Sequence, residues 1–230
     1  MRMKSLIVGD VKFQFKYGFY FVYAVFSIVY AAIIYVLPNS WKETAATIMI
    51  FSDPAAMGLF FMGAIVLLEK SERVLNSIAV SPVKVWEYIL SKVISLGFIA
   101  TLVGLLLAIA AGENNINDFI LIVLGTFLGS VIFTLLGLIV AANINSLNQF
   151  LIATVPFELI IFLPPMLYLY GYHILILRLH PGSIIIQLLL GKSESLVLNL
   201  TIFAIFIGLL FLVTCRVLKR MFQSVGGIKL

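Results

Sequence analysis

Long apolar stretches dominate this sequence and restrict it to a helical membrane fold. Hydrophobic residues make up 63% of the chain and charged residues only 11%, whereas soluble domains average about 45–50% and about 25%. A helix needs about 20 apolar residues to cross about 30 Å of hydrocarbon. The stretches that qualify or nearly do so are residues 19–37, 53–68, 86–111, 119–142, 150–170 and 197–215. The sequence therefore predicts an all-α polytopic membrane protein with six transmembrane helices, in which residues 1–230 form one domain.

Helix-breaking residues interrupt two of these predicted spans. The second span is short, and Asp53-Pro54 indicates a break near its outer end. The fifth contains Pro156 and Pro164-Pro165, which we expect to interrupt it because proline removes a helical hydrogen bond. In the fourth span, three small residues favour close helix packing, namely Gly125, Gly129 and Gly137.

Residues 172–190, before the last span, are apolar but contain His180-Pro181-Gly182 in their middle. This segment is too irregular for a span. It predicts a pair of re-entrant half-helices that enter the membrane from the external side. Such backbone is tolerated only where protein or water covers its freed polar groups.

Lysine and arginine are distributed unequally between the two sides of the predicted bundle. One side holds three of the fifteen, Lys42, Arg178 and Lys192. The other twelve are Arg2, Lys4, Lys12, Lys16, Lys70, Arg73, Lys84, Lys92, Arg216, Lys219, Arg220 and Lys229. Because the basic side of a membrane protein remains in the cytoplasm, we predict that both termini are cytoplasmic.

The predicted cytoplasmic loop between the second and third spans is unusually charged. Seven of the chain's 25 formal charges fall between Glu69 and Lys92. At about 100° per residue, a helix over residues 69–80 separates two faces. Its polar face comprises Glu69, Lys70, Glu72, Arg73, Asn76 and Ser77, and its apolar face comprises Val74, Leu75, Ile78 and Ala79. Ser81-Pro82 is then expected to start the third span, with Ser81 as its N-cap.

This pattern predicts a short amphipathic helix within residues 69–82, at the membrane surface. One interpretation is a surface for a water-soluble partner. The alternative is an ordinary interfacial helix whose charges reach into water.

Two motifs in this loop resemble the cytoplasmic loop of ABC-2 type permeases. They are Glu69-Lys-Ser-Glu-Arg-Val-Leu75 and Val80-Ser-Pro-Val-Lys-Val-Trp-Glu-Tyr-Ile-Leu-Ser-Lys-Val93. Within that family, Gly18-Phe-Tyr-Phe-Val-Tyr23 with Leu37-Pro38 is most similar to permeases for fluoroquinolone export. The resemblance extends over nearly the whole chain. It includes the six spans, the cytoplasmic termini, an N-terminal interfacial segment (residues 1–17) and the re-entrant half-helices.

The resemblance implies the membrane subunit of an ATP-driven exporter in a prokaryotic cytoplasmic membrane. A separate ATPase, which carries ATP and Mg, would be present in two copies. A second permease copy would complete the transporter, and we expect the two permeases to form a homodimer. The ATPase would contact the amphipathic helix within residues 69–82, called the coupling helix in this family. The contacting residues would be Glu69, Lys70, Glu72, Arg73 and Asn76. The N-terminal segment would lie beside it, with Lys4, Lys12 and Lys16 also attracted to anionic lipid.

The chain carries none of the motifs that we would expect of an enzyme or a cofactor protein. Gly191-Lys192-Ser193 is not a phosphate-binding loop, because Ile186 occupies the position of its first glycine. Only two histidines are present, His173 and His180, and Cys215 is the single cysteine. We therefore predict no catalytic residues, no metal, no cofactor in this chain and no nucleic-acid partner.

Glu158 is the one acidic residue that the sequence places deep inside a predicted span, rather than at its end. A carboxylate there should face a partner or a wet cavity, so it is a candidate contact for a cationic substrate, with Pro156 loosening the helix beside it. Alternatively, Glu158 is protonated at a dimer interface, or is the proton site of an ion-gradient-driven secondary transporter.

An aromatic stripe, Tyr23, Phe26 and Tyr30, follows the first span and either lines a substrate path or packs against a partner. The resemblance implies that the first and fifth spans form the dimer seam and the substrate path, near Glu158. Drugs, antimicrobial peptides and lipid-linked sugars all remain candidate substrates, and we favour a hydrophobic or drug-like aromatic one.

Overall fold

The computed structural model describes residues 2–52, 57–172, 174–191 and 195–225. Over these residues the chain forms α-helices and no β-strand, which confirms the all-α prediction. The helices are α1 (Arg2–Lys16), α2 (Phe19–Val36), α3 (Asn39–Ile50), α4 (Met57–Ser71), α5 (Val74–Ala79), α6 (Val85–Ala111), α7 (Ile116–Ala142), α8 (Leu147–Leu169), α9 (Leu175–Arg178), α10 (Pro181–Leu189) and α11 (Leu196–Val225).

Among the described residues, five helices are long and apolar enough to cross a membrane, namely α2, α6, α7, α8 and α11. The remaining predicted span, residues 53–68, corresponds to α4, which begins at Met57 and has only 15 residues. The predicted break at Asp53-Pro54 lies outside the described residues. The count of six spans therefore stays a prediction.

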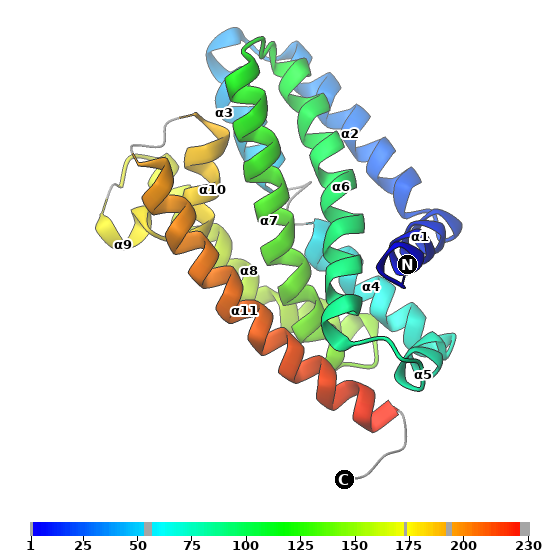
Figure 1. Ribbon diagram of the computed structural model, residues 1–230. Helices are drawn as coiled ribbons and strands as arrows, with labels where there is room; N and C mark the ends of the chain where they lie inside the picture. The colour runs from blue at the N-terminus through cyan, green and yellow to red at the C-terminus, as the bar shows by residue number, and fades with distance from the viewer. Residues whose placement is uncertain (1, 53–56, 173, 192–194, 226–230) are drawn as a thin grey trace.

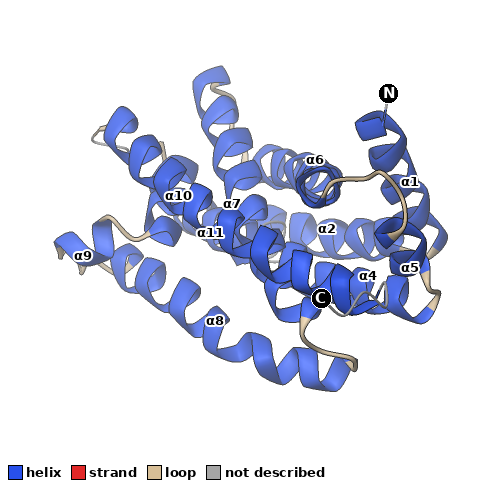
Figure 2. Cartoon of the chain, turned by 60° about the horizontal axis from the view of Figure 1, so that its bottom comes forward, coloured by secondary structure: helices blue, strands red, loops and turns tan. Residues whose placement is uncertain are grey.

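Two long helices, α6 and α7, form the centre of the bundle (Figure 1). Helices α4, α10 and α11 pack on α7, while α1 and α2 pack on α6 (Figure 2). Glycines allow the closest approaches: a Cβ on Gly137 of α7 would lie only 2.7 Å from the Leu59 carbonyl oxygen of α4. Gly125 likewise lies against Leu188 of α10, so both glycines mark close helix contacts, as predicted.

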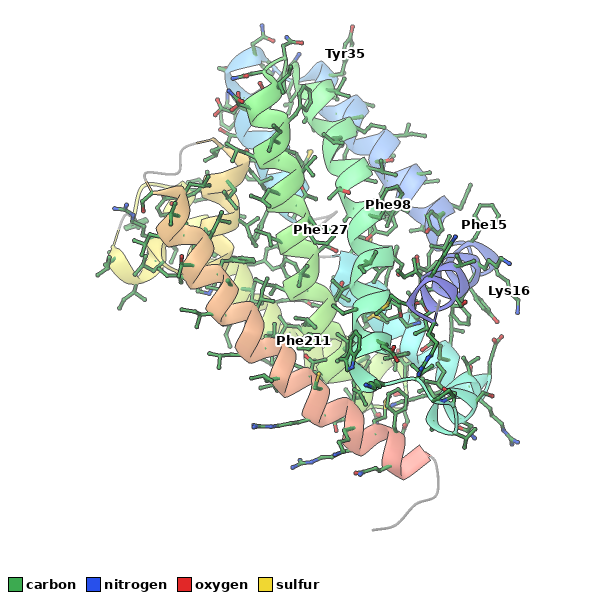
Figure 3. The ribbon with its side chains drawn as sticks, in the orientation of Figure 1. Phe15, Lys16, Tyr35, Phe98, Phe127 and Phe211 are labelled. Carbon is green, nitrogen blue, oxygen red and sulfur yellow. The ribbon has the colours of Figure 1, made fainter. Side chains whose placement is uncertain are left out.

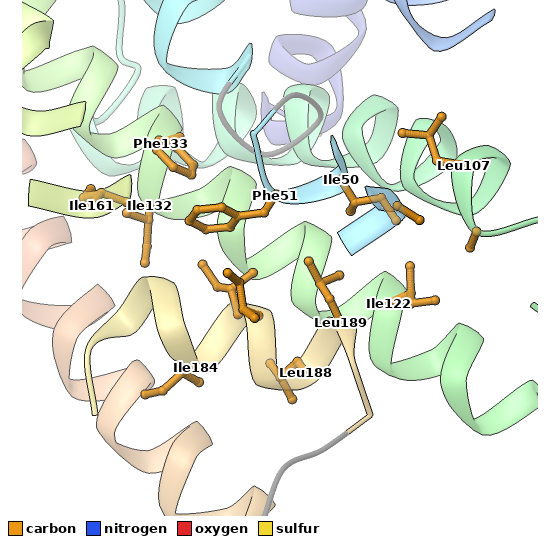
Figure 4. Close-up of a cluster of buried hydrophobic side chains, with 14 of the residues drawn as sticks. Ile50, Phe51, Leu107, Ile122, Ile132, Phe133, Ile161, Ile184, Leu188 and Leu189 are labelled. Carbon is orange, nitrogen blue, oxygen red and sulfur yellow. The ribbon is translucent and has the colours of Figure 1, made fainter. Parts of the chain in front are cut away.

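The largest apolar cluster joins α7, α8 and α10 to the end of α3 (Figure 4). Phe51 meets Phe133 and Phe162 edge-on at centroid distances of 6.0 and 5.1 Å. Ile184 and Leu188 of α10 are fully buried against this cluster. The core therefore includes a helix too short to span a membrane.

The segment at residues 172–190 contains two short helices, α9 and α10, as the sequence predicts. The Gly182 N–H donates to His180 Nδ1 at 3.2 Å and so caps α10. A Cβ on Gly182 would lie 2.8 Å from the Ile161 carbonyl oxygen of α8, so this glycine permits a close contact. Protein covers most of α10, whereas its depth in a membrane stays a prediction.

The expected interruption of the fifth span is wrong. Helix α8 continues from Leu147 to Leu169 with Pro156, Pro164 and Pro165 inside it. Each proline removes one hydrogen bond of the helix, but a full break would expose more backbone groups, which an apolar environment disfavours.

Apolar side chains cover much of the outer surface, as a membrane-embedded bundle requires. Tyr35 and Phe98 point away from the helices (Figure 3), whereas Phe127 lies between α6 and α7 against Gly97. An exposed apolar surface of this extent on a single chain indicates contact with lipid or with another protein.

Candidate functional site at the charged end of the bundle

Polar and charged side chains gather at one end of the bundle, which we call the charged end. It comprises α5, the last turn of α4, the first turns of α6 and the last turns of α11, with α1 beside them (Figure 1). The candidate site lies here.

The helix predicted over residues 69–80 is wrong, because the chain turns in its middle. Helix α4 ends at Ser71, and α5 begins at Val74. Between them Arg73 adopts the left-handed conformation with φ 59°. A non-glycine residue in this region is disfavoured by about 1–2 kcal/mol, so the surrounding contacts must hold the turn.

This turn divides the five predicted docking residues into two sets. Glu72, Arg73 and Asn76 are exposed at the surface, and their contact with a partner stays a prediction. Glu69 is buried and Lys70 is half-buried, and both make contacts inside the bundle. We call residues 72–82 the docking loop, and Glu69 and Lys70 are not part of it.

The docking loop is anchored on α11. Leu75 of α5 is fully buried in a cluster with Leu218 and Met221. Val80, by contrast, is 82% exposed among the loop's polar residues. The loop therefore has one face packed on the bundle and another exposed.

The predicted N-cap of the third span is wrong by three residues. Helix α6 begins at Val85, and the Lys84 N–H donates to the Glu87 carboxylate at 2.8 Å. Ser81 instead closes the loop, since its hydroxyl donates to the Ile78 carbonyl at 2.7 Å and accepts the Val83 N–H at 3.3 Å.

Helix α1 contacts the docking loop at both of the loop's ends. The Arg2 guanidinium donates to the Pro82 carbonyl at 3.0 Å. At the other end of α1, Lys16 Nζ lies 3.9 Å from the Glu72 carboxylate (Lys16 is labelled in Figure 3). Exposed pairs of this kind contribute little individually, so the position of α1 must depend on buried contacts.

Lys70 closes the end of α7. Its ammonium donates to the carbonyls of Ala141, Ala142 and Ile144 at 2.8, 3.2 and 2.7 Å. The first two carbonyls belong to the last turn of α7, and the third lies just beyond it. Orphan acceptors and the helix dipole at such a terminus favour a cation. Partial burial lowers the pKa of Lys70 from its ordinary value.

A buried ionic group lies directly beneath the docking loop. Lys92 of α6, which is 1% exposed, forms ion pairs with Glu69 of α4 and with Asp10 of α1, the latter at 2.5 Å. The Tyr88 hydroxyl donates to the second oxygen of Glu69 at 2.6 Å. We call Asp10, Glu69, Tyr88 and Lys92 the Lys92 cluster. It joins three helices through one ammonium group.

Two neighbouring contacts extend the Lys92 cluster. The Gln14 amide of α1 donates to the Ser95 hydroxyl of α6 at 2.8 Å, and both residues are buried. The Tyr88 ring meets Phe222 of α11 edge-on at 5.3 Å. Helices α1, α4, α6 and α11 therefore all contribute to this region.

The Lys92 cluster could not be predicted from sequence spacing, because its members are far apart along the chain. Lys92 lies 23 residues from Glu69 and 82 from Asp10, and no local spacing connects them. The available signal was the position of Lys92 two turns inside an apolar span, where a cation requires a partner.

Glu158 lies on α8, away from the charged end. One of its carboxylate oxygens is buried and accepts no hydrogen bond. It borders a groove of about 320 Å³ whose other lining residues are Val155, Leu159, Phe162, Leu163 and Met166. Pro156, which lies between the groove residues Val155 and Glu158 along α8, is exposed. A carboxylate in such apolar surroundings is suited to a cation or a hydrogen-bond donor.

The aromatic stripe of α2 has both buried and exposed members. Tyr23 is buried and meets Phe61 edge-on at 4.8 Å. Phe26 is exposed and stacks on Tyr30 with centroids 6.1 Å apart.

Within one chain, the main packing partner of α2 is α6, whereas that of α8 is α10. The predicted approach of the stripe to Glu158 therefore requires a second copy of the chain.

In the part of the chain that the structure describes, no three His, Cys, Asp or Glu side chains gather as a metal site. His173 lies outside the described residues. The predictions on cofactors and nucleic acid stay predictions.

Long apolar helices and an end rich in exposed charge define a multi-pass helical membrane protein. The model of the fluoroquinolones export permease protein family matches residues 1–225, so the chain belongs to this family of membrane transport proteins. It is also similar to two fluoroquinolones export permease proteins of Mycobacterium tuberculosis, from strains CDC 1551 / Oshkosh and ATCC 25618 / H37Rv. Each is 29% identical over 150 residues, which cover 64% of this chain and 62% of the relative's length.

Proposed function

We propose that this chain is the membrane permease subunit of an ATP-driven exporter, and that a separate ATPase binds the docking loop. The observation that carries the proposal is the loop itself, an exposed charged turn with one face anchored on α11 and α1. The family supports the permease assignment, and the resemblance of the loop to that of ABC-2 permeases supports the ATPase. Two ATPase copies and two permease copies would form the transporter.

The charged end would face the cytoplasm of a prokaryotic cell. Exposed basic residues concentrate there, namely Lys4, Lys12, Lys16, Arg73, Lys84, Arg216, Lys219 and Arg220. This excess favours the cytoplasmic side, where an ATPase has access to ATP and Mg. The same lysines of α1 would contact anionic lipid.

We propose a fluoroquinolone-like aromatic drug as the substrate. The names of the two relatives support this class. Glu158, with an unpaired oxygen beside an apolar groove, would contact the cationic amine that such drugs carry. Its groove and the aromatic stripe of α2 would meet across the interface of two copies.

The experiment that tests the exporter is co-purification from native membranes in mild detergent. We expect an ATPase with a phosphate-binding loop to be retained with the native chain. In the double variant Glu72→Arg/Arg73→Glu, we expect retention to fall at least tenfold, because both charges of the exposed turn are reversed. Mass spectrometry of the retained proteins gives the measurement.

A matched control reverses two charges at the opposite end of the bundle, with Lys42→Glu and Glu113→Arg. It leaves the net charge unchanged, as the test variant does, and should retain the ATPase fully. If crosslinked native membranes yield no ATPase, the exporter proposal is wrong.

The second candidate is a secondary transporter in which Glu158 carries a proton, and the unpaired oxygen is the observation that favours it. Glu158→Gln distinguishes the two in vesicles. Under the exporter proposal we expect this variant to reduce ATP-driven uptake of a cationic fluoroquinolone about tenfold. Uptake of an uncharged aromatic dye should stay within twofold. Uptake that needs no ATP but requires a pH gradient, and is lost in Glu158→Gln, would favour the secondary transporter.

A further inference from the structure

The Lys92 cluster lies where the docking loop, the interfacial helix α1 and the central helix α6 meet. We propose that Lys92 is a positioning residue that transmits displacement of the docking loop to α6, through the ion pairs that it forms with Glu69 and Asp10. This inference rests on the proposed function, since it assigns a role in coupling ATP hydrolysis to transport.

Two connections run from the docking loop to the same ammonium group. The first is short: Glu69 lies in the last turn of α4, three residues before Glu72, and pairs with Lys92. The second runs through α1, which contacts the loop through Arg2 and Lys16 and pairs with Lys92 through Asp10. Movement of the loop would therefore act on α4 directly, through the chain, and on α1 through these contacts.

Burial makes these connections stiff. Lys92 is 1% exposed, Glu69 3%, and the Asp10 side chain 12%. Moving either carboxylate away from Lys92 would leave that carboxylate in a largely buried position without its cation, which is unfavourable. Tyr88 further fixes Glu69, because its hydroxyl occupies the oxygen that Lys92 does not contact. We therefore expect α1, the end of α4 and α6 to move together.

Helix α6 can carry this displacement across the membrane. It has 27 residues from Val85 to Ala111, a length of about 40 Å at 1.5 Å per residue. Lys92 lies in its second turn, close to the docking loop, and the remainder of the helix packs along α7 and α2. A shift at Lys92 therefore becomes a shift of a continuous helix at the centre of the bundle.

A variant that removes the charges but keeps the sizes of the side chains distinguishes the proposed role in coupling from a purely structural role. The neutral triple variant, Asp10→Asn/Glu69→Gln/Lys92→Met, replaces each group by one of similar size. Replacing a complete buried ion cluster by hydrophobic residues of similar volume is often neutral or stabilising. Here Lys92 becomes apolar, and the two carboxylates become amides, which carry no charge and can still form hydrogen bonds. We therefore expect this variant to fold, with a melting temperature near that of the native chain, and to retain the ATPase on co-purification.

The decisive measurement is transport per ATP hydrolysed, in vesicles that contain the complete complex and a fluorescent fluoroquinolone. We expect the neutral triple variant to hydrolyse ATP but to lose transport per ATP at least tenfold. The matched control, Asp118→Asn/Glu113→Gln/Lys42→Met, makes the same three changes near the opposite end of the bundle. Its transport per ATP should stay within twofold of the native value.

A second variant keeps the proposal testable if the triple variant does not accumulate. Asp10→Asn preserves the pair of Lys92 with Glu69 and loosens only the connection through α1. We expect it to fold, to bind the ATPase and to lose transport per ATP several-fold. Unchanged transport per ATP in both variants, or in Asp10→Asn alone if the triple variant is not obtained, would overturn the proposal. Failure of the native chain to bind any ATPase would instead overturn the proposed function.

Discussion

Replacing Lys92 by methionine alone should lower the free energy of unfolding by about 3–5 kcal/mol, the usual effect of removing one partner of a buried ion pair. The substitution preserves most of the side-chain volume but leaves Glu69 and Asp10 buried without their cation. We expect a large fall in the melting temperature of the purified protein in detergent, and reduced accumulation in membranes.

Lys84→Met is the matched control, since Lys84 precedes the same helix but its side chain is exposed. It should leave the melting temperature nearly unchanged. Adding Asp10→Asn and Glu69→Gln to Lys92→Met should restore most of the lost stability, because the surplus buried charges are then removed. Equal stability of Lys92→Met and Lys84→Met would contradict the buried ion pairs.

The contact between α4 and α7 should tolerate no side chain at Gly137. A Cβ there would lie 2.7 Å from the Leu59 carbonyl oxygen and 2.8 Å from the Met62 Cβ. Because backbone cannot move aside as a flexible side chain can, Gly137→Ala should destabilise the protein by about 1–3 kcal/mol, the usual range for overpacking. The same detergent melting measurement applies.

Gly208→Ala on α11 provides the comparison, because a Cβ at that position meets nothing within 4 Å. Alanine is favoured over glycine in a helix by about 1 kcal/mol, so this variant should be as stable as the native chain or slightly more stable. If Gly137→Ala behaves in the same way, the close approach of α4 and α7 is wrong.

The long central helices could be predicted closely from the sequence. Helix α6 was predicted over residues 86–111 and begins at Val85, and α7 was predicted over 119–142 and begins at Ile116. Their apolar runs are long, and polar or glycine residues end them. Gly112, for example, takes the left-handed conformation with φ 89° directly after α6.

The turn between α4 and α5 could not be predicted from local sequence. The left-handed residue is Arg73 rather than a glycine or asparagine, so the usual marker of such a turn is missing. What maintains the turn is tertiary: Glu69 and Lys70 have partners inside the bundle, while Leu75 is buried against α11. The amphipathic pattern predicts one helix for all these residues, because it contains no information about partners that are distant in the sequence.

The candidate substrate region was predicted only as far as a single chain allows. The sequence identifies Glu158 as a carboxylate within an apolar helix, and the structure places it beside a groove with one oxygen unpaired. Which residues would face Glu158 in the proposed dimer depends on the second copy, and no pattern along one chain specifies that geometry.

The anchoring of α5 on α11 has a consequence for biogenesis. The docking loop belongs to the first half of the chain. Its buried residue, Leu75, packs against Leu218 and Met221, which lie in α11. Helix α1, from the other extremity, supplies the remaining contacts of the loop. The docking loop is thus fixed to the bundle only once α11 is in place. Under the proposed function, an ATPase would find its finished binding surface only after that helix has been synthesised.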